Sequence, residues 1–136
     1  MLSPNWDTVR LSLHVIAATI WVGGQFTLAG LVPTLRAHDA ELPKKVARQF
    51  NRLAWPAYGV LIATGIWSLL RHDMASQSNA YNLTVFLKLV IVGVAGFAAV
   101  VHSNTRSKVV LAVGGALSGL ASLAAVFVGI LLTSAH

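Results

Sequence analysis

The sequence predicts an all-α fold: an integral membrane bundle of four transmembrane helices. Of its 136 residues, 56% are hydrophobic and only 10% are charged, with a mean hydropathy of +0.71. A soluble domain carries about 25% charged residues. Most of the apolar residues fall in four long segments, and each is close to the roughly 20 residues that cross a hydrocarbon core of ~30 Å. We expect a single domain over residues 1–136, with spans at about 11–35, 53–70, 83–101 and 109–132.

The charge and the cysteine content exclude several classes of function. The chain has no cysteine, which excludes disulfides, thiolate zinc sites, iron–sulfur clusters and c-type haem attachment. Its net charge of +6 is typical of nucleic-acid binding, but membrane proteins also concentrate Lys and Arg in their cytoplasmic loops. We therefore expect a lipid bilayer as the partner and no nucleic acid. The first apolar segment is too long for the core of a signal peptide, so we expect it to be a mature span.

The distribution of Lys and Arg among the loops predicts the orientation. Residues 36–52 carry five of them and residues 103–108 carry two, whereas Arg10 and Arg71 are the basic residues on the other side. The positive-inside rule then places the first and third loops in the cytoplasm. We expect a multi-pass protein of a bacterial-type inner (plasma) membrane with both termini outside.

The first span carries polar side chains on one face. His14, Ala18, Trp21 and Gln25 follow one another at i, i+4, i+7 and i+11, which is a single face of an α-helix. We expect this face to line the interior of the bundle. His14 and Trp21 are therefore candidate residues of a ligand or metal site.

Lys88 is a charged residue inside the third span. A lysine at the centre of a membrane helix costs about 2.5–3.5 kcal/mol on insertion scales, so intramembrane charges usually face a bundle interior or mark a function. Its amine can instead extend to the outer headgroups, and both interpretations stay open. His14 and Lys88 both lie in the outer halves of their spans, so the two polar groups can meet there. We expect Lys88 to share a site with His14.

The fourth span presents a face of small residues. These residues are Gly115, Ser118, Ser122, Ala125 and Gly129. Small residues allow the backbones of membrane helices to approach closely. The face can pack inside the bundle, or it can dock on a second copy of the chain or on a larger membrane complex.

Three stretches of the sequence resemble CopD-type membrane proteins, which are linked to bacterial copper uptake and resistance. The resemblance covers nearly the whole chain and rests on a first-helix histidine followed by W-x-G-G, a basic entry to a helix ending in TG, and an LKL sequence. The stretches are LHVIAATIWVGGQF, RQFNRLAWPAYGVLIATGIWSLL and FLKLVIVGVAGFAAVVHSNTR. The resemblance implies copper handling or transport at the outer half of the bundle. Imidazole suits copper, and the histidines on the predicted outer side are His14, His72 and His136.

A weaker similarity, to the HemJ-type oxidases, gives a second interpretation. These small four-helix proteins have a first-helix histidine and a third-helix lysine implicated in haem binding, and the matching positions here are His14 and Lys88. The similarity implies a b-type haem protein, with His14 as axial ligand and Lys88 as its second ligand or propionate partner. A third interpretation is a non-catalytic accessory subunit of a larger membrane complex. The three interpretations stay open at this point.

Overall fold

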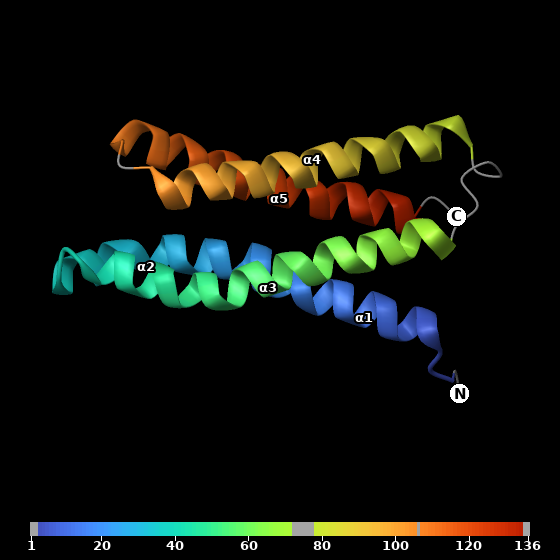
Figure 1. The fold of residues 1–136 in the computed structure, drawn as a ribbon, viewed down its shortest axis with the longest axis horizontal. Helices are drawn as coiled ribbons and strands as arrows, with labels where there is room; N and C mark the ends of the chain where they lie inside the picture. The colour runs from blue at the N-terminus through green and yellow to red at the C-terminus, as the bar shows by residue number, and fades with distance from the viewer. Residues whose placement is uncertain (1–2, 72–77, 106, 135–136) are drawn as a thin grey trace. The chain divides into compact units, whose positions relative to one another are not determined.

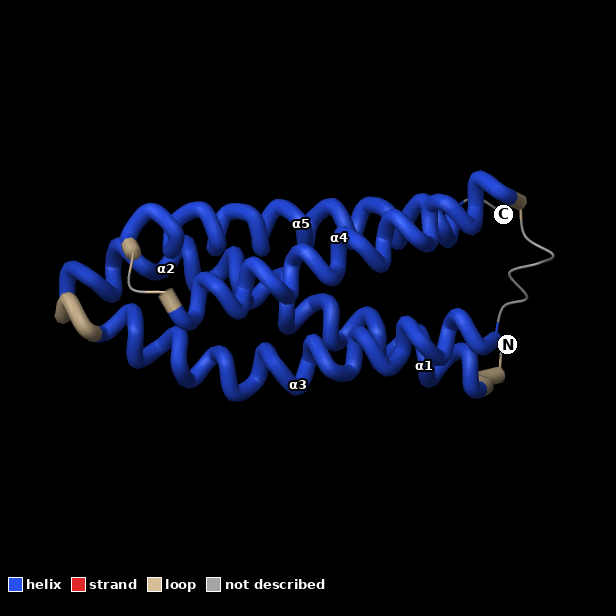
Figure 2. Tube along the Cα trace, turned by 45° about the horizontal axis from the view of Figure 1, so that its top comes forward, coloured by secondary structure: helices blue, strands red, loops and turns tan. Residues whose placement is uncertain are grey.

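The described part of the chain is almost entirely helical. The structure is a computed structural model and describes residues 3–71, 78–105 and 107–134. No strand occurs among those residues (Figure 2). This confirms the all-α fold class. The chain divides into two compact units, Met1–His72 and Asp73–His136, and each is described by itself.

Unit 1 begins with a long, composite helix. It consists of α1 (Trp6–Ala18), the π-helical turn η1 (Thr19–Gly23) and α2 (Gly24–His38), which follow one another without a break (Figure 1). Its start is fixed by a capping box, because the Asn5 side chain accepts a hydrogen bond from the Thr8 amide while the Thr8 hydroxyl accepts one from the Asn5 amide. Such caps satisfy amide groups that have no partner within the helix.

The second long helix of unit 1, α3 (Leu42–Arg71), returns antiparallel to the first. Pro43 stands in its first turn, where a proline removes no helical hydrogen bond. The helix therefore starts well before the apolar segment predicted at residue 53. α1 packs against the later part of α3, and α2 packs against its earlier part.

Unit 2 is a hairpin of two long helices, α4 (Asn79–Asn104) and α5 (Lys108–Ser134). The Ser78 hydroxyl caps the first of them by accepting a hydrogen bond from the Tyr81 amide. The two helices meet through small residues, and the Ser118 hydroxyl donates to the Ala95 carbonyl across the interface at 3.0 Å. A Cβ atom at Gly114 would lie 3.3 Å from the Ala98 carbonyl oxygen, so the backbones approach closely here.

The number of membrane spans agrees with the prediction. Four helices are long and apolar enough to cross a membrane: Trp6–His38, Leu42–Leu70, Asn79–Asn104 and Lys108–Ser134. Each contains one of the predicted spans and extends beyond it. The multi-pass membrane character thus follows from helix length and composition.

Candidate functional site

The first predicted site residue, His14, is held by the neighbouring helix of unit 1. It lies on α1, partly buried, and its Nδ1 atom is 2.8 Å from the hydroxyl of Thr64 on α3. Thr64 is buried, with 3% of its surface exposed, so this hydrogen bond forms away from the helix surface. Sequence periodicity placed His14 on an inward face, and the contact with α3 agrees with that placement.

The direction of the hydrogen bond follows from the other contacts of Thr64. Its hydroxyl lies 2.7 Å from the Val60 carbonyl and 3.1 Å from the Leu61 carbonyl, and carbonyl oxygens can only accept. The single hydroxyl proton is directed to these carbonyls, so the hydroxyl oxygen accepts a hydrogen bond from the Nδ1–H group of His14. A neutral His14 then carries its lone pair on Nε2. Metal-binding histidines are oriented in this way, by a hydrogen bond from the ring nitrogen that does not bind the metal.

A second polar contact lies one helical turn nearer the start of α1. Arg10 is buried, with 8% of its surface exposed, and its guanidinium donates to the Ser68 hydroxyl on α3. The same guanidinium lies 3.5 Å from the carboxylate of Asp7. The Ser68 hydroxyl donates to the Thr64 carbonyl at 3.0 Å, so it repeats the pattern of Thr64 one turn along α3.

Arg10 was not predicted as a site residue, because a charge at this position was expected outside the membrane. A signal was present in the sequence. Arg10 and His14 are four residues apart on one helix, and Thr64 and Ser68 are four residues apart on another. Equal spacing of donors and hydroxyl acceptors allows two antiparallel helices to form two hydrogen bonds in successive turns.

The second predicted site residue, Trp21, lies in the π-helical turn η1 and is buried, with 4% of its surface exposed. Its ring contacts two rings of α3: the centroid distances are 5.3 Å to Trp55 and 4.7 Å to Tyr58. The rings of Trp55 and Tyr58 also contact each other, at a centroid distance of 5.8 Å, so the three rings form one cluster between the helices. π-Helical turns are rare and occur often at functional sites.

Lys88 lies on α4 in unit 2 and is partly buried. Its Nζ atom lies against α5, 3.0 Å from the point where a Cβ atom would stand at Gly129. The missing side chain at Gly129 therefore leaves room for the amine. His14 and Lys88 belong to different units, so their shared site stays a prediction.

His102, near the end of α4, has a structural contact. Its Nδ1 atom lies 2.6 Å from the Leu111 carbonyl on α5, and because the carbonyl can only accept, Nδ1 is the donor. The ring also lies 2.9 Å from the point where a Cβ atom would stand at Gly115. His102 therefore joins the two helices where the chain reverses.

The candidate copper ligands are only partly described. His14 lies on α1, whereas His72 and His136 lie outside the described residues. Within the described ranges, no three His, Asp or Glu side chains are grouped so that they could hold a metal ion. The copper set His14, His72 and His136 therefore stays a prediction.

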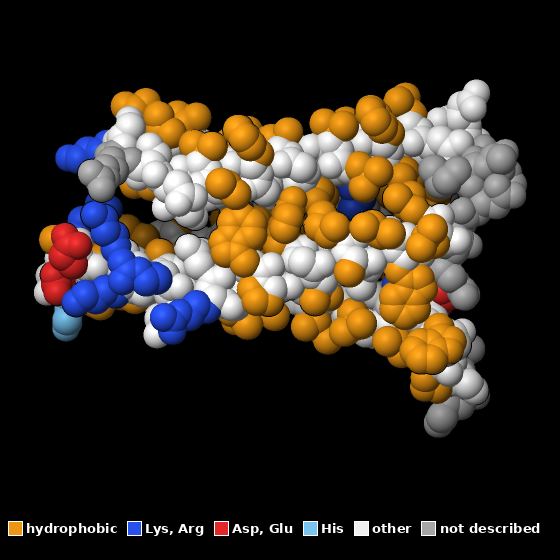
Figure 3. Space-filling view, viewed as in Figure 1, with side chains coloured by type: hydrophobic (Ala, Val, Ile, Leu, Met, Phe, Trp, Pro, Cys, Tyr) orange, Lys and Arg blue, Asp and Glu red, His pale blue; other side chains and the backbone are white. Residues whose placement is uncertain are grey.

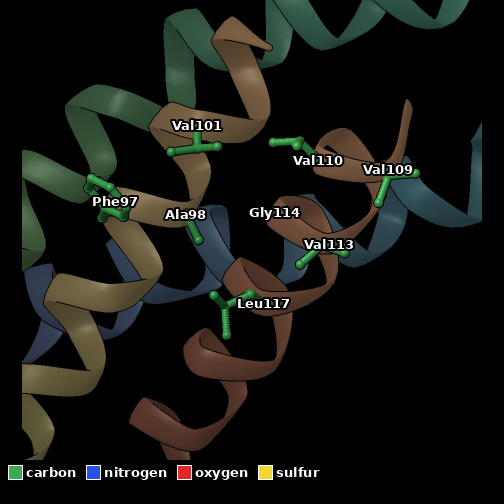
Figure 4. A pocket seen from close by; sticks show the side chains of 8 residues that line it. All are labelled: Phe97, Ala98, Val101, Val109, Val110, Val113, Gly114 and Leu117. Carbon is green, nitrogen blue, oxygen red and sulfur yellow. The ribbon is translucent and has the colours of Figure 1, made fainter. Parts of the chain in front are cut away.

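The small-residue face of α5 packs within unit 2. Its members Ser118 and Ser122 are buried, and Gly115 and Gly129 contact His102 and Lys88 of α4. An apolar groove on the same hairpin presents no charged or hydrogen-bonding side chain (Figure 4). It is lined by Phe97, Ala98, Val101, Val109, Val110, Val113, Gly114 and Leu117.

The chain was compared with known proteins, and no family model, curated protein or solved structure matches it.

Proposed function

We propose that this integral membrane protein binds b-type haem, with His14 as an axial ligand. The observation that carries the proposal is the hydrogen bond from His14 Nδ1 to Thr64, whose own proton is directed to backbone carbonyls. It orients the imidazole and assigns the lone pair to Nε2, the atom that binds iron in most haem proteins with a proximal histidine. When bound, the haem would supply one-electron chemistry.

Haem needs fewer protein ligands at His14 than a copper ion does. Haem iron is already held by four porphyrin nitrogens, so a single protein imidazole is a sufficient anchor. A copper ion needs several protein ligands, and the described residues hold no such group around His14. Arg10, one turn from His14, is a cation of the type that pairs with carboxylates such as haem propionates.

An absorption spectrum tests this function. We expect the protein expressed with haem supply and purified in detergent to show a Soret band that is lost in His14→Ala. Thr64→Val keeps the side-chain shape but removes the acceptor of Nδ1, so it should shift the band or weaken haem retention. The matched control is His102→Ala, which removes the histidine near the end of α4 in unit 2. It should leave the spectrum unchanged. The absence of a Soret band in the wild-type protein would refute haem binding.

The pairing of Lys88 with His14 is a prediction from the sequence, and it has a test of its own. Lys88→Met and His14→Ala should each reduce haem content, and the double variant should lose little more than either single one, because residues that serve one site are not additive. Unchanged content in Lys88→Met would remove Lys88 from the site. In that case we expect Lys88→Met to be neutral or stabilising, because it removes a costly charge from the membrane.

Copper handling is the second candidate, and it is favoured by one observation in unit 1. The start of α1 lies beside the end of α3, where the rings of Trp6 and Trp67 are 6.4 Å apart. His72 follows α3 directly in the sequence and lies outside the described residues, so a copper site of His14 and His72 stays a prediction. Copper bound without a Soret band, and lost in both His14→Ala and His72→Ala, would establish this function in place of the first.

The proposed orientation has both termini outside, in a bacterial-type inner membrane. It rests on the excess of Lys and Arg between α2 and the apolar part of α3. Single cysteines introduced as Ser3→Cys and Ala40→Cys can be labelled with an impermeant reagent in intact cells. We expect labelling of the first and protection of the second, and the opposite pattern would reverse the orientation.

A further inference from the structure

One face of α3 is turned away from the other helices of unit 1. The side of α3 that packs on α1 and α2 is marked by a buried or contacting residue in almost every turn. At 100° per residue these residues fall within an arc of about 80°. They are Phe50, which contacts Gly24, the buried Ala54 and Ala57, and the hydrogen-bonded Thr64 and Ser68.

The opposite face of α3 begins with four cations. Lys44, Lys45, Arg48 and Arg52 are all exposed and fall within an arc of about 100°. They extend over eight residues, or about 12 Å of helix. None of them forms an ion pair with any residue in the described ranges. Figure 3 shows Lys and Arg side chains gathered over the end of unit 1 where α2 meets α3.

The same face becomes apolar farther along the helix. Gly59 follows the last cation by two turns, and nothing lies within 4 Å of the point where its Cβ atom would stand. Beyond this glycine come Ile62, Ile66 and Leu70, which are 38%, 52% and 82% exposed. α3 has 30 residues and is thus about 45 Å long, whereas the hydrocarbon core is ~30 Å thick. The first turns, with the cations, therefore extend beyond the hydrocarbon.

We propose that this face of α3 binds an anionic phospholipid of the leaflet that surrounds the start of the helix. Along the helix the cations come first and the apolar residues second, in the same order as the charged headgroup and the acyl chain of such a lipid. Arg48 and Arg52 face the phosphate with guanidinium groups, which bind phosphate oxygens in a bidentate manner. Below them, an acyl chain lies over Gly59 and against Ile62 and Ile66. The four unpaired cations supply the charge complementarity, since each basic residue near an anionic membrane surface contributes about 1 kcal/mol, or roughly fivefold in affinity.

Lipid retention in native mass spectrometry tests the headgroup half of the proposal. The detergent-purified full chain is mixed with equal amounts of phosphatidylglycerol and phosphatidylcholine that carry the same acyl chains. We expect wild-type protein to retain phosphatidylglycerol preferentially, and Arg48→Gln/Arg52→Gln to lower this preference about fivefold or more. The control Arg36→Gln/Lys108→Gln removes two exposed cations that lie off this face and should keep the preference. No preference in the wild-type protein, or an equal loss in both double variants, would overturn the proposal.

Two further measurements separate a lipid from other anionic ligands. Gly59→Leu fills the gap under the acyl chain and should lower the number of retained lipids, whereas Gly30→Leu, at an equally open glycine of α2, should not. Equal effects of the two substitutions would remove the acyl-chain contact. Displacement of phosphatidylglycerol by millimolar inorganic phosphate would show a simple anion site, and displacement by an acidic peptide alone would show a protein-docking surface. Either displacement would overturn the proposal, and none of these readouts depends on haem or copper.

Discussion

The two units of the chain join their helices by different means. In unit 1, α1 and α3 are connected by long polar and aromatic side chains: Arg10 to Ser68, His14 to Thr64, and Trp21 to Trp55 and Tyr58. In unit 2, α4 and α5 approach through glycine, alanine and serine. Burying a polar side chain costs free energy of desolvation, which its hydrogen-bond partner must offset. Small residues instead let the helix backbones approach closely without that cost. The difference shows that α1 and α3 are joined mainly by polar and aromatic contacts, and that α4 and α5 are joined mainly by close packing of small residues.

The largest expected effect is at the closest approach of unit 2. Gly114→Leu places a side chain where the Ala98 carbonyl and the His102 backbone lie 3.3 Å from a Cβ atom. Because backbone atoms cannot move aside singly, we expect a loss of about 3 kcal/mol in the free energy of unfolding. Reversible unfolding in mixed micelles, followed by circular dichroism, measures it. The control is Gly93→Leu on α4, where the Cβ atom meets open space; a comparable loss there would show that lipid exposure, and not close packing, sets the cost.

A matched pair of serine substitutions compares the two interfaces directly. Ser68→Ala removes the hydroxyl that accepts from the buried Arg10, whose Nε atom has no hydrogen-bond partner among the described residues. We expect it to cost about 1.5 kcal/mol, because a buried charge loses a partner. Ser118→Ala removes a neutral hydrogen bond to the Ala95 carbonyl and should cost about 0.6 kcal/mol, the mean for polar contacts between membrane helices. Equal costs in the same micelle assay would contradict the contrast between the units.

The smallest expected effect is at Gly129. A Cβ atom there would lie 3.0 Å from Nζ of Lys88, the far end of a flexible side chain that can move aside. We therefore expect Gly129→Ala to change the free energy of unfolding by less than about 0.5 kcal/mol. A large destabilisation would show that the amine of Lys88 is fixed in place, which would strengthen its assignment to a site. The same unfolding titration provides the measurement.

The spans and the inward position of His14 could be predicted because both depend on periodicity and length within one segment. Apolar runs of about 20 residues identify a span without any knowledge of its neighbours. The partner of His14 could not be predicted in the same way, because Thr64 is 50 residues away and its contact depends on the register between α1 and α3. Arg10 was misjudged for the same reason: a charge at the edge of an apolar segment is usually exposed, and only the position of Ser68 shows that it is buried.

The place of Lys88 beside Gly129 also depends on register, here between α4 and α5. The expected face His14, Ala18, Trp21 and Gln25 assumed one uniform period, but the π-helical turn at Thr19–Gly23 changes that period. Trp21, within this turn, is nevertheless buried against α3, as the predicted face requires. This local irregularity has no distinct signature in the sequence of this span.

The wide turn of η1 also has a consequence for how relatives of this chain would differ from it. A π-helical turn accommodates one more residue than the α-helix around it. A related protein whose first helix is α-helical throughout would have one residue fewer between His14 and Gln25 while its outer polar contacts stayed in place. An alignment of the two chains would then need a one-residue gap in the middle of a membrane helix, where gaps are ordinarily forbidden. Without that gap, either the histidine or the residues of α2 would be paired with the wrong positions.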